Sequence, residues 1–328
     1  MLKQVQHDEN YLSMNFRTNI QLQKERNQIA YSSEIVLIGS CFSENISNKL
    51  HYFKFNSFSN PFGILYNPTA IENLITHAVN LKEYSEEDIF YLNERWHCFE
   101  AHSDLSNTNK QQLIHTLNTS IQLTYSKLKT ASHIVITLGS AWVYRFIEND
   151  TIVGNCHKIP QKKFLKELLS VKKIIENLES SIALVKSINP AVNFIFTVSP
   201  VRHLKDGFTE NAQSKAHLIT AIQQLTNKRN QIYYFPSYEI MMDDLRDYRF
   251  YANDMLHPNE TAIAYIWEKF KDVWISENAT PVMKQVDSIQ KGLAHKPFNP
   301  NSASYQQFLN DLHAKIELLK DKYGIIFS

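Results

Sequence analysis

The stretch EIVLIGSCFSENI, residues 34–46, decides the fold that the sequence predicts. A run of β-branched and apolar residues ends at Gly39, and a helical pattern follows at once. Continuous apolar runs of this kind are typical of strands that are covered on both faces of a parallel sheet. Further runs that end in Gly, Ser or Pro occupy residues 133–140, 192–200 and 231–237, and a weaker one occupies 51–59.

Amphipathic helical patterns lie between these runs. Apolar residues recur at three- and four-residue steps over residues 110–129, 164–188 and 261–274. Strands and helices that alternate in this way predict an α/β fold, here a three-layer α/β/α sandwich with a mainly parallel sheet. Ligands of such sheets bind beyond the carboxyl ends of the strands.

Three segments fall outside this alternation. Residues 84–108 alternate like a hairpin and are interpreted as an insertion. Residues 277–328 are interpreted as a linker followed by a helix at about 304–323, and residues 1–13 as an N-terminal extension. The main domain is therefore expected to span residues 14–276.

Composition argues against several classes of function. The net charge of +1 argues against a broad surface for nucleic acid or acidic lipid. We expect no membrane span and a cytoplasmic protein, because no run of 18 apolar residues and no apolar signal stretch is present. The three cysteines favour free thiols. Scattered histidines and the lack of a glycine-rich phosphate loop predict neither a metal nor a cofactor, and the oligomeric state stays open.

Cys41 stands where the first strand ends and the next helix begins. Free backbone N–H groups and the positive end of the helix dipole favour a thiolate at such a position, and the same N–H groups can hold an oxyanion. The alternative is structural: Ser40 or Ser43 caps the helix, and Cys41 is a small core residue. This stretch alone does not choose between the two interpretations.

Asp254 and His257 form a second candidate site, just before the helical pattern at 261–274. A carboxylate three residues before an imidazole can hold its Nδ1 and leave Nε2 free as a general base. A solvated capping turn is the alternative. If this last helix begins at the same sheet edge as Cys41, the three residues form a nucleophile, a base and an orienting carboxylate.

The sequence resembles the GSCFA family, a bacterial group placed with the SGNH (GDSL-like) hydrolases. The resemblance covers roughly residues 14–323 and implies a sheet of flavodoxin-like strand order. The matching blocks are IGSCFSENI (38–46), NPFGILYNP (60–68), TLGSAWVY (137–144), NCHKIP (155–160), SPVRHLKDG (199–207), RDYRFYANDMLHPN (246–259) and HKPFNP (295–300).

The resemblance also implies catalytic roles for particular residues. The first block of SGNH hydrolases reads Gly-Asp-Ser, and the matching positions here are Gly39, Ser40 and Cys41. Cys41 thus occupies the nucleophile position, and Ser40 replaces the usual aspartate. The last block, Asp-x-x-His, matches Asp254 and His257. A thiol ionises readily, so this pair suffices to activate it.

The two blocks that supply oxyanion donors match the family pattern less completely. The oxyanion glycine of the second block matches Gly63. The third block usually reads Gly-x-Asn, whereas this chain has Gly139, Ser140 and Ala141, so its asparagine is missing. The backbone N–H groups of Cys41 and Gly63 are the candidates that remain. The alternatives for a side-chain donor are Asn60, Asn67 and Asn155.

Other residues are expected to line the substrate pocket. Trp142 is interpreted as an apolar wall, with core packing as the alternative. Arg202 and His203 follow a strand, and Arg202 has the geometry to bind a carboxylate or phosphate, or else forms a surface salt bridge. His157 belongs to a block of the resemblance and is placed in the pocket, with a buried loop as the alternative.

We therefore expect an acyl-ester hydrolase or acyltransferase. Cys41 attacks, His257 is the base, and Asp254 orients it, on a small-molecule or carbohydrate ester. The changed Gly-Asp-Ser block and the missing asparagine favour an alternative, a catalytically silent protein that binds a carbohydrate or acyl group. A third possibility is a redox protein that uses the single thiol of Cys41.

Overall fold

The computed structural model describes residues 18–226 and 231–327. Within these ranges the main sheet has five strands, all parallel, in the order β2-β1-β5-β9-β10. Numbered along the chain, this is the flavodoxin-like order 2-1-3-4-5, as expected. The strands are β1 (Glu34–Gly39), β2 (Asn56–Ser59), β5 (His133–Leu138), β9 (Asn193–Val198) and β10 (Ile232–Phe235).

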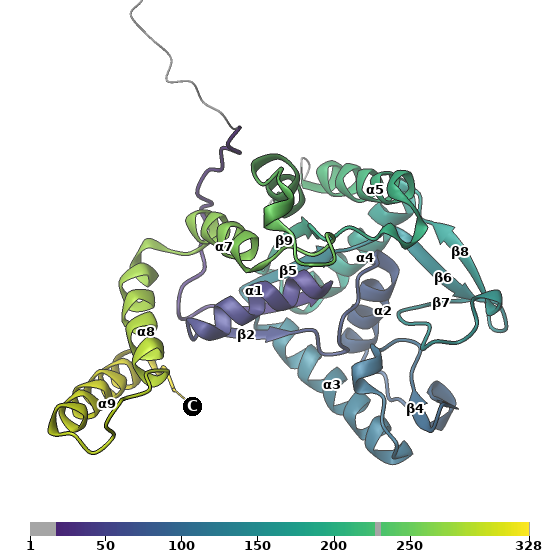
Figure 1. Cartoon of the computed structure of the whole chain (residues 1–328). Coiled ribbons are helices and arrows are strands. Elements are labelled where there is room, and N and C mark those ends of the chain that lie inside the picture. Colours follow the sequence, from purple (N-terminus) through teal and green to yellow (C-terminus); the bar gives the residue numbers. More distant parts are fainter. Residues whose placement is uncertain (1–17, 227–230, 328) are drawn as a thin grey trace, which may run out of the picture.

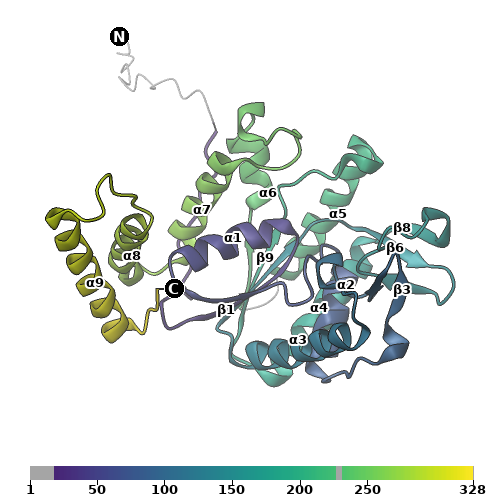
Figure 2. The same cartoon turned by 60° about the horizontal axis from the view of Figure 1, so that its bottom comes forward.

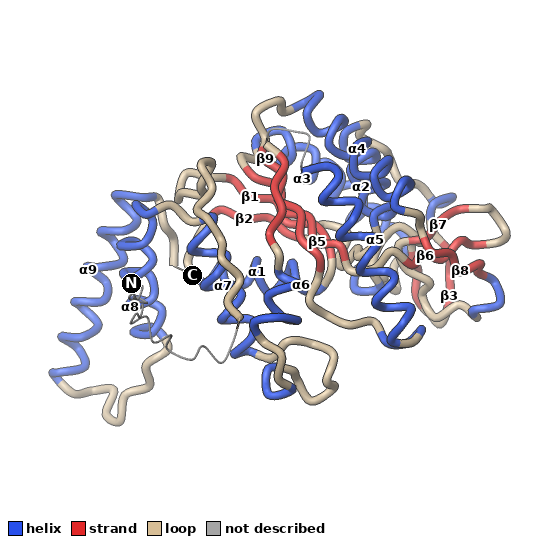
Figure 3. The backbone as a smooth tube through the Cα atoms, turned by 90° about the horizontal axis from the view of Figure 1, so that it is seen from above, coloured by secondary structure: helices blue, strands red, loops and turns tan. Residues whose placement is uncertain are grey.

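Side chains of each strand alternate between two separate cores, which produces the three layers. Val36 and Ile38 of β1 face one core, whereas Ile35 and Leu37 face the other. Figure 3 shows the sheet between the two helical layers. The first core is covered by α2 (Pro68–Val79), α3 (Lys110–Thr130), α4 (Val171–Ile188) and α5 (Phe208–Thr226), and the second by α1 (Cys41–Tyr52), α7 (Glu260–Trp274) and the segment 240–241. The short α6 (Ser237–Glu239) contacts the first core through Tyr238.

Side-chain caps fix where most of these helices begin. Ser40, Asn67 and Asn259 each accept a backbone N–H at the start of α1, α2 and α7. The remaining short helical segments are η1 (Glu86–Asp88), η2 (Ser103–Leu105), η3 (Gln161–Lys163), η4 (Leu204–Asp206), η5 (Ile240–Asp244), η6 (Tyr248–Phe250) and η7 (Glu277–Ala279).

The helix expected over residues 164–188 begins only at Val171. Residues 164–168 instead form β8 (Phe164–Leu168), which pairs antiparallel with β6 (Trp142–Phe146). With β7 (Thr151–Val153) they make a second, three-stranded sheet at the side of the molecule (Figure 1). The strand expected over 51–59 was also too long, because α1 continues to Tyr52.

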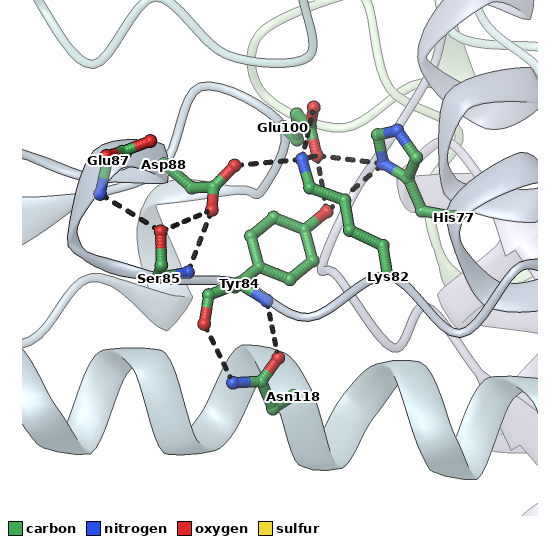
Figure 4. Close-up of polar contacts among 8 residues, drawn as sticks. All are labelled: His77, Lys82, Tyr84, Ser85, Glu87, Asp88, Glu100 and Asn118. Carbon is green, nitrogen blue, oxygen red and sulfur yellow. Dashed lines mark hydrogen bonds and ion pairs between the residues drawn. The ribbon is translucent and has the colours of Figure 1, made fainter.

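The insertion at 84–108 contains the predicted hairpin, formed by β3 (Phe90–Leu92) and β4 (Arg95–His97). A partly buried cluster around Glu100 attaches the insertion to the helices (Figure 4). The Glu100 carboxylate lies 3.0 Å from His77 Nδ1 and 3.4 Å from Lys82 Nζ, and it accepts a hydrogen bond from the hydroxyl of Tyr84. Asn118 of α3 holds the backbone of Tyr84 through two hydrogen bonds.

The C-terminal region contains the expected helix, α9 (Ala303–Tyr323), and one that was not expected, α8 (Thr280–Leu293). They share a small core of their own with Val286, Ile289 and Leu312 (Figure 2). Tyr52 at the end of α1 donates to Asp287 of α8. The proposed extension 1–13 lies outside the described residues. No described helix combines the length and apolar character needed to cross a bilayer.

The Glu100 cluster predicts an acid-sensitive contribution to stability. Burial opposes ionisation of Glu100, but His77, Tyr84 and Lys82 outweigh it and lower the pKa from 4.5 to about 2. The contribution is therefore present above pH 4.5 and is lost as the pH falls towards 2. At neutral pH, Glu100→Gln should lower the free energy of unfolding by about 1–3 kcal/mol in urea denaturation.

The exposed Glu83 provides the matched control. Glu83→Gln should change the free energy of unfolding by less than about 0.5 kcal/mol at every pH. Equal losses in the two variants at neutral pH would show that the cluster does not stabilise the insertion.

Candidate functional site

The turn after β1 sets the position of Cys41. Gly39 has φ +149°, and a Cβ there would lie 2.2 Å from the carbonyl oxygen of Thr137 on β5. Its N–H donates to Asn60 Oδ1 at 2.9 Å, and the N–H of Ser40 donates to Thr137 O at 3.0 Å. Ser40 then caps α1, so Cys41 is the first residue of the helix. Only glycine fits this close approach of β1 to β5.

The electrostatic surroundings of Cys41 differ from the expectation. Burial and then Glu44 raise the pKa of its thiol, while Lys215 and the N–H groups of Cys41 and Phe42 lower it. The net effect is a raised pKa, so the resting side chain is a thiol and the expected thiolate is not favoured. The helix start is present, but burial outweighs it.

Asp254 and His257 form the expected pair. His257 Nδ1 lies 2.5 Å from Asp254 Oδ2, and Asp254 Oδ1 accepts the N–H groups of Leu256 and His257 at 2.9 and 3.0 Å. These two N–H groups, with the imidazole, lower the pKa of Asp254 to about 2. Both side chains are about half exposed. Both interpretations of the sequence are therefore met at once. Asp254 accepts the N–H groups of the turn and also holds the imidazole of His257.

The fold brings Cys41 and His257 to one edge of the sheet. Helices α1 and α7 lie side by side on the same face and share a core through Phe42, Ala262 and Trp267 (Figure 1). The loop after β9 contacts the turn before α7, because Arg202 N donates to Leu256 O at 3.4 Å. Among the residues that the structure describes, no hydrogen bond joins the Cys41 thiol to His257.

A cavity of about 470 Å³ opens at the same edge. Gly139 connects it to the start of α1, since a Cβ there would lie 2.8 Å from Tyr66 Cβ and 3.4 Å from Ser40 Cβ. Cys41 and His257 do not line the cavity themselves. Its walls are Tyr66, Ser140, Trp142, Tyr144, Gly154, Asn155, Cys156, Lys158, Ile159, Gln161, His203, Lys205 and Asp206.

His203 lies between the cavity and the Asp254–His257 turn. Its ring stacks on Tyr66 with centroids 5.9 Å apart, and its buried Nε2 has no hydrogen-bond partner within the described ranges. Burial, then Lys215 and His257, lower the pKa of His203 to about 4. At neutral pH it is an uncharged imidazole with one unused nitrogen, which a bound ligand would satisfy.

Trp142 and Arg202 are two further residues that the sequence predicts in the pocket, and both make contacts near this edge of the sheet. Trp142 lines the cavity, donates its indole N–H to Glu210 O, and has Lys166 Nζ 4.4 Å from its ring centre. Arg202 lies 3.2 Å from Met242 Sδ and stacks over Tyr251. No ion pair to a carboxylate is formed by Arg202 within the described part of the chain, so the predicted surface salt bridge is absent there.

Several N–H groups that were expected to bind the oxyanion already donate hydrogen bonds to backbone carbonyls. The N–H of Gly63 donates to Asn60 O at 2.8 Å, and its φ of +70° serves a turn packed against His102. The N–H groups of Gly139 and Ser140 both donate to Tyr66 O, at 2.7 and 3.2 Å. The interpretation of Gly63 as an oxyanion donor is therefore wrong for this conformation.

The asparagine alternatives have structural roles. Asn60 accepts from Gly39, and Asn67 caps α2 through Ala70 N. Asn155 lies on the cavity wall, with Oδ1 accepting the N–H of His157. Asn155 is thus the one of the three that lines the cavity.

His157 is a buried loop residue rather than part of the cavity wall. Its Nε2 contacts Cys98 O at 2.7 Å and its Nδ1 contacts Ser103 Oγ at 3.3 Å. Burial lowers its pKa to about 4. Both nitrogens have partners within the protein, which favours the alternative of a buried loop residue over a role in substrate binding.

One residue of this edge was not identified from the sequence. Lys215 of α5 is 2 % exposed and donates to Gly139 O and Ser199 O, both at 2.8 Å. A signal existed, because Lys215 shares the three- and four-residue spacing of Leu218, Ile222 and Leu225 on the buried face. The helix itself was not predicted, so that spacing was not recognised.

No metal centre is formed by the described residues, since none of them assemble three or more His, Cys, Asp or Glu side chains around one point. The fold and the site define an α/β protein in which Cys41 begins α1 and the Asp254–His257 pair precedes α7, both at the carboxyl edge of a flavodoxin-like sheet. The chain belongs to the GSCFA family, whose profile matches residues 34–270. The C-terminal domain of GSCFA domain proteins matches residues 286–326. A comparison with curated proteins found no match.

The contact between β1 and β5 predicts that Gly39 tolerates no side chain. Gly39→Ala should lower the free energy of unfolding by about 2–4 kcal/mol, because the new methyl group meets the backbone of Thr137. Gly324→Ala is the control, since Gly324 also has a positive φ of +67° but no atom within 4 Å of the added Cβ.

Gly324→Ala should lower the free energy of unfolding by only about 1 kcal/mol, because only the backbone conformational preference of the residue changes. Chemical denaturation of both variants measures the difference. Similar losses for the two would mean that β1 and β5 can separate at Gly39 without cost.

Proposed function

We propose that this protein is an acyl-ester hydrolase or acyltransferase of the SGNH type. The observation that carries the proposal is the bond between Asp254 and His257 at the sheet edge where Cys41 begins α1. It leaves the imidazole Nε2 available as an acid–base group at the sheet edge that also holds the start of α1 and the cavity. Family membership places the same three residues within the matched region.

The chemistry follows in two steps. In the first, His257 takes the S–H proton of Cys41, the sulfur attacks the acyl carbonyl, and the alcohol leaves with that proton. The product is a thioester on Cys41. In the second, His257 takes a proton from water or from an acceptor hydroxyl, which attacks the thioester and frees the thiol. Asp254 holds Nδ1 throughout and stabilises the imidazolium.

The donor for the developing oxyanion is the backbone N–H of Cys41. This N–H and that of Phe42 are close enough to the thiol to lower its pKa. Both belong to the first turn of α1, where the helix dipole favours negative charge. Asn155 adds a side-chain amide to the wall of the cavity.

The cavity fits a carbohydrate ester. Tyr66, Trp142 and Tyr144 give it aromatic walls, and Gln161 and Asp206 add hydrogen-bonding groups. Aromatic faces with a few polar groups suit a ring that carries hydroxyls. The cysteines are all free, which fits a reducing compartment, here the cytoplasm.

One set of observations favours a second function, a binding protein without activity. The N–H groups of Gly63, Gly139 and Ser140 are all bonded to carbonyls, and the thiol pKa is raised. A protein that only binds needs neither free donors nor an activated thiol. The cavity and the unused nitrogen of His203 would serve binding equally well.

Turnover of a panel of acyl esters, with mass spectrometry of the protein, tests the proposal. Cys41→Ala should abolish both the acyl adduct and turnover. His257→Gln and Asp254→Asn should lower the rate by about 10²–10⁴-fold. Cys98→Ala and His295→Gln are matched controls, because Cys98 is buried and does not line the cavity, and His295 is exposed.

The outcomes separate the three possibilities. Persistent turnover in Cys41→Ala would show that Cys41 is not the nucleophile. Saturable binding of a sugar ester without turnover or adduct would support the binding protein. Rapid labelling of Cys41 by iodoacetamide with no turnover of any ester would support a redox role.

A further inference from the structure

The ammonium group of Lys215 lies inside the protein between two strand ends. Its Nζ donates to Gly139 O, just after β5, and to Ser199 O, just after β9, both at 2.8 Å. The residue is 2 % exposed, and no carboxylate forms an ion pair with it in the part of the chain that the structure describes. A buried charge without a counter-ion is costly, so this lysine is either neutral or balanced by another group.

Cys41 is the acidic group whose charge interacts with Lys215, although no hydrogen bond joins its thiol to Nζ among the described residues. Burial lowers the pKa of Lys215 to about 7, and the interaction with Cys41 opposes this shift. Conversely, Lys215 lowers the pKa of the Cys41 thiol against the effects of burial and Glu44. The two residues are neighbours through Gly139, which bonds to Lys215 and lies against Ser40.

The other groups that face this pair come from three elements. His203, in the loop after β9, is made harder to protonate by Lys215. The ring of Tyr238 on α6 lies 5.5 Å from Lys215 Nζ. Glu44 on α1 repels a thiolate at Cys41. Within the described residues no carboxylate contacts the amine directly, which leaves the cysteine as its acidic partner.

The geometry of the amine suits a proton acceptor. A neutral amine has two hydrogens, and the carbonyls of Gly139 and Ser199 can receive both. Its lone pair then occupies the remaining tetrahedral position, which becomes an N–H when the amine is protonated. The two hydrogen bonds therefore hold the nitrogen in place in both charge states.

We propose that Cys41 and Lys215 form a thiol–amine pair that shares one proton, so that Lys215 receives the proton when the thiolate forms. The S–H bond of Cys41 breaks, its electron pair stays on sulfur, and a new N–H bond forms at Nζ. The step creates no net charge. It rests on the proposed function for the role of Cys41 as nucleophile, and it makes Lys215 rather than His257 the acceptor of the thiol proton. The imidazolium form of His257 then protonates the leaving alcohol, the neutral imidazole takes a proton from the attacking water or hydroxyl, and Lys215 returns its proton to the sulfur.

The pH dependence of Cys41 alkylation by iodoacetamide tests the pair without any ester. In the full-length protein the rate, followed by peptide mass from about pH 5 to pH 10, should rise twice, near pH 7 and again above pH 9. The first rise marks loss of the first proton from the pair. A wild-type profile with a single rise above pH 9 would overturn the proposal.

Two variants test whether Lys215 causes the rise in alkylation rate near pH 7. Lys215→Met and Lys215→Gln should lose it and react about tenfold more slowly at pH 8, with the rise above pH 9 retained. Gln keeps a hydrogen-bond donor for the carbonyls, so it remains informative if Met does not fold, which circular dichroism monitors. Lys129→Met, at an exposed position, should match the wild-type profile.

His257→Gln separates this proposal from the proposed function. Retention of the first rise in this variant, with its loss in both Lys215 variants, supports the pair. Loss in His257→Gln together with retention in the Lys215 variants overturns the pair and assigns the thiol proton to His257. A profile as expected in a protein that turns over no ester would refute the proposed function while the pair stands.

Discussion

The close approach of β1 to β5 at their carboxyl ends governs the geometry of the site. Gly39 brings the β1 backbone against Thr137, and the same contact sets the N–H of Ser40 on the Thr137 carbonyl. From that point the cap of α1 and the position of Cys41 follow. In a sheet of order 2-1-3-4-5 this is also the point where the strand order reverses, so a crevice opens there for topological reasons.

Burial and charge are closely balanced around this crevice. Cys41, His203 and Lys215 are each partly or fully removed from water, and for each the uncharged form is favoured by burial. Asp254, by contrast, is exposed, accepts three hydrogen bonds and is firmly ionised. A proton transfer among Cys41, His203 and Lys215 would therefore change the local field strongly.

The sequence predicted those features that depend on local pattern. The apolar runs at 34–40 and 133–140 became neighbouring strands, and the spacing of Asp254 and His257 sufficed to place a carboxylate on Nδ1. Features that depend on distant partners were not predicted. FLKEL (164–168) fits helix or strand, and its pairing with β6 decides the outcome. Likewise, whether the N–H of Gly63 is free depends on the turn back to Asn60, which the residue types do not specify.

The two C-terminal helices are attached at the opposite end of α1 from Cys41. Tyr52, the last residue of that helix, bonds to Asp287, and Gln290 donates to the Tyr52 carbonyl. Twelve helical residues span about 18 Å, which separates this attachment from the crevice. The family's C-terminal domain can therefore present a surface of its own without covering the cavity, and α1 is one element that links the two.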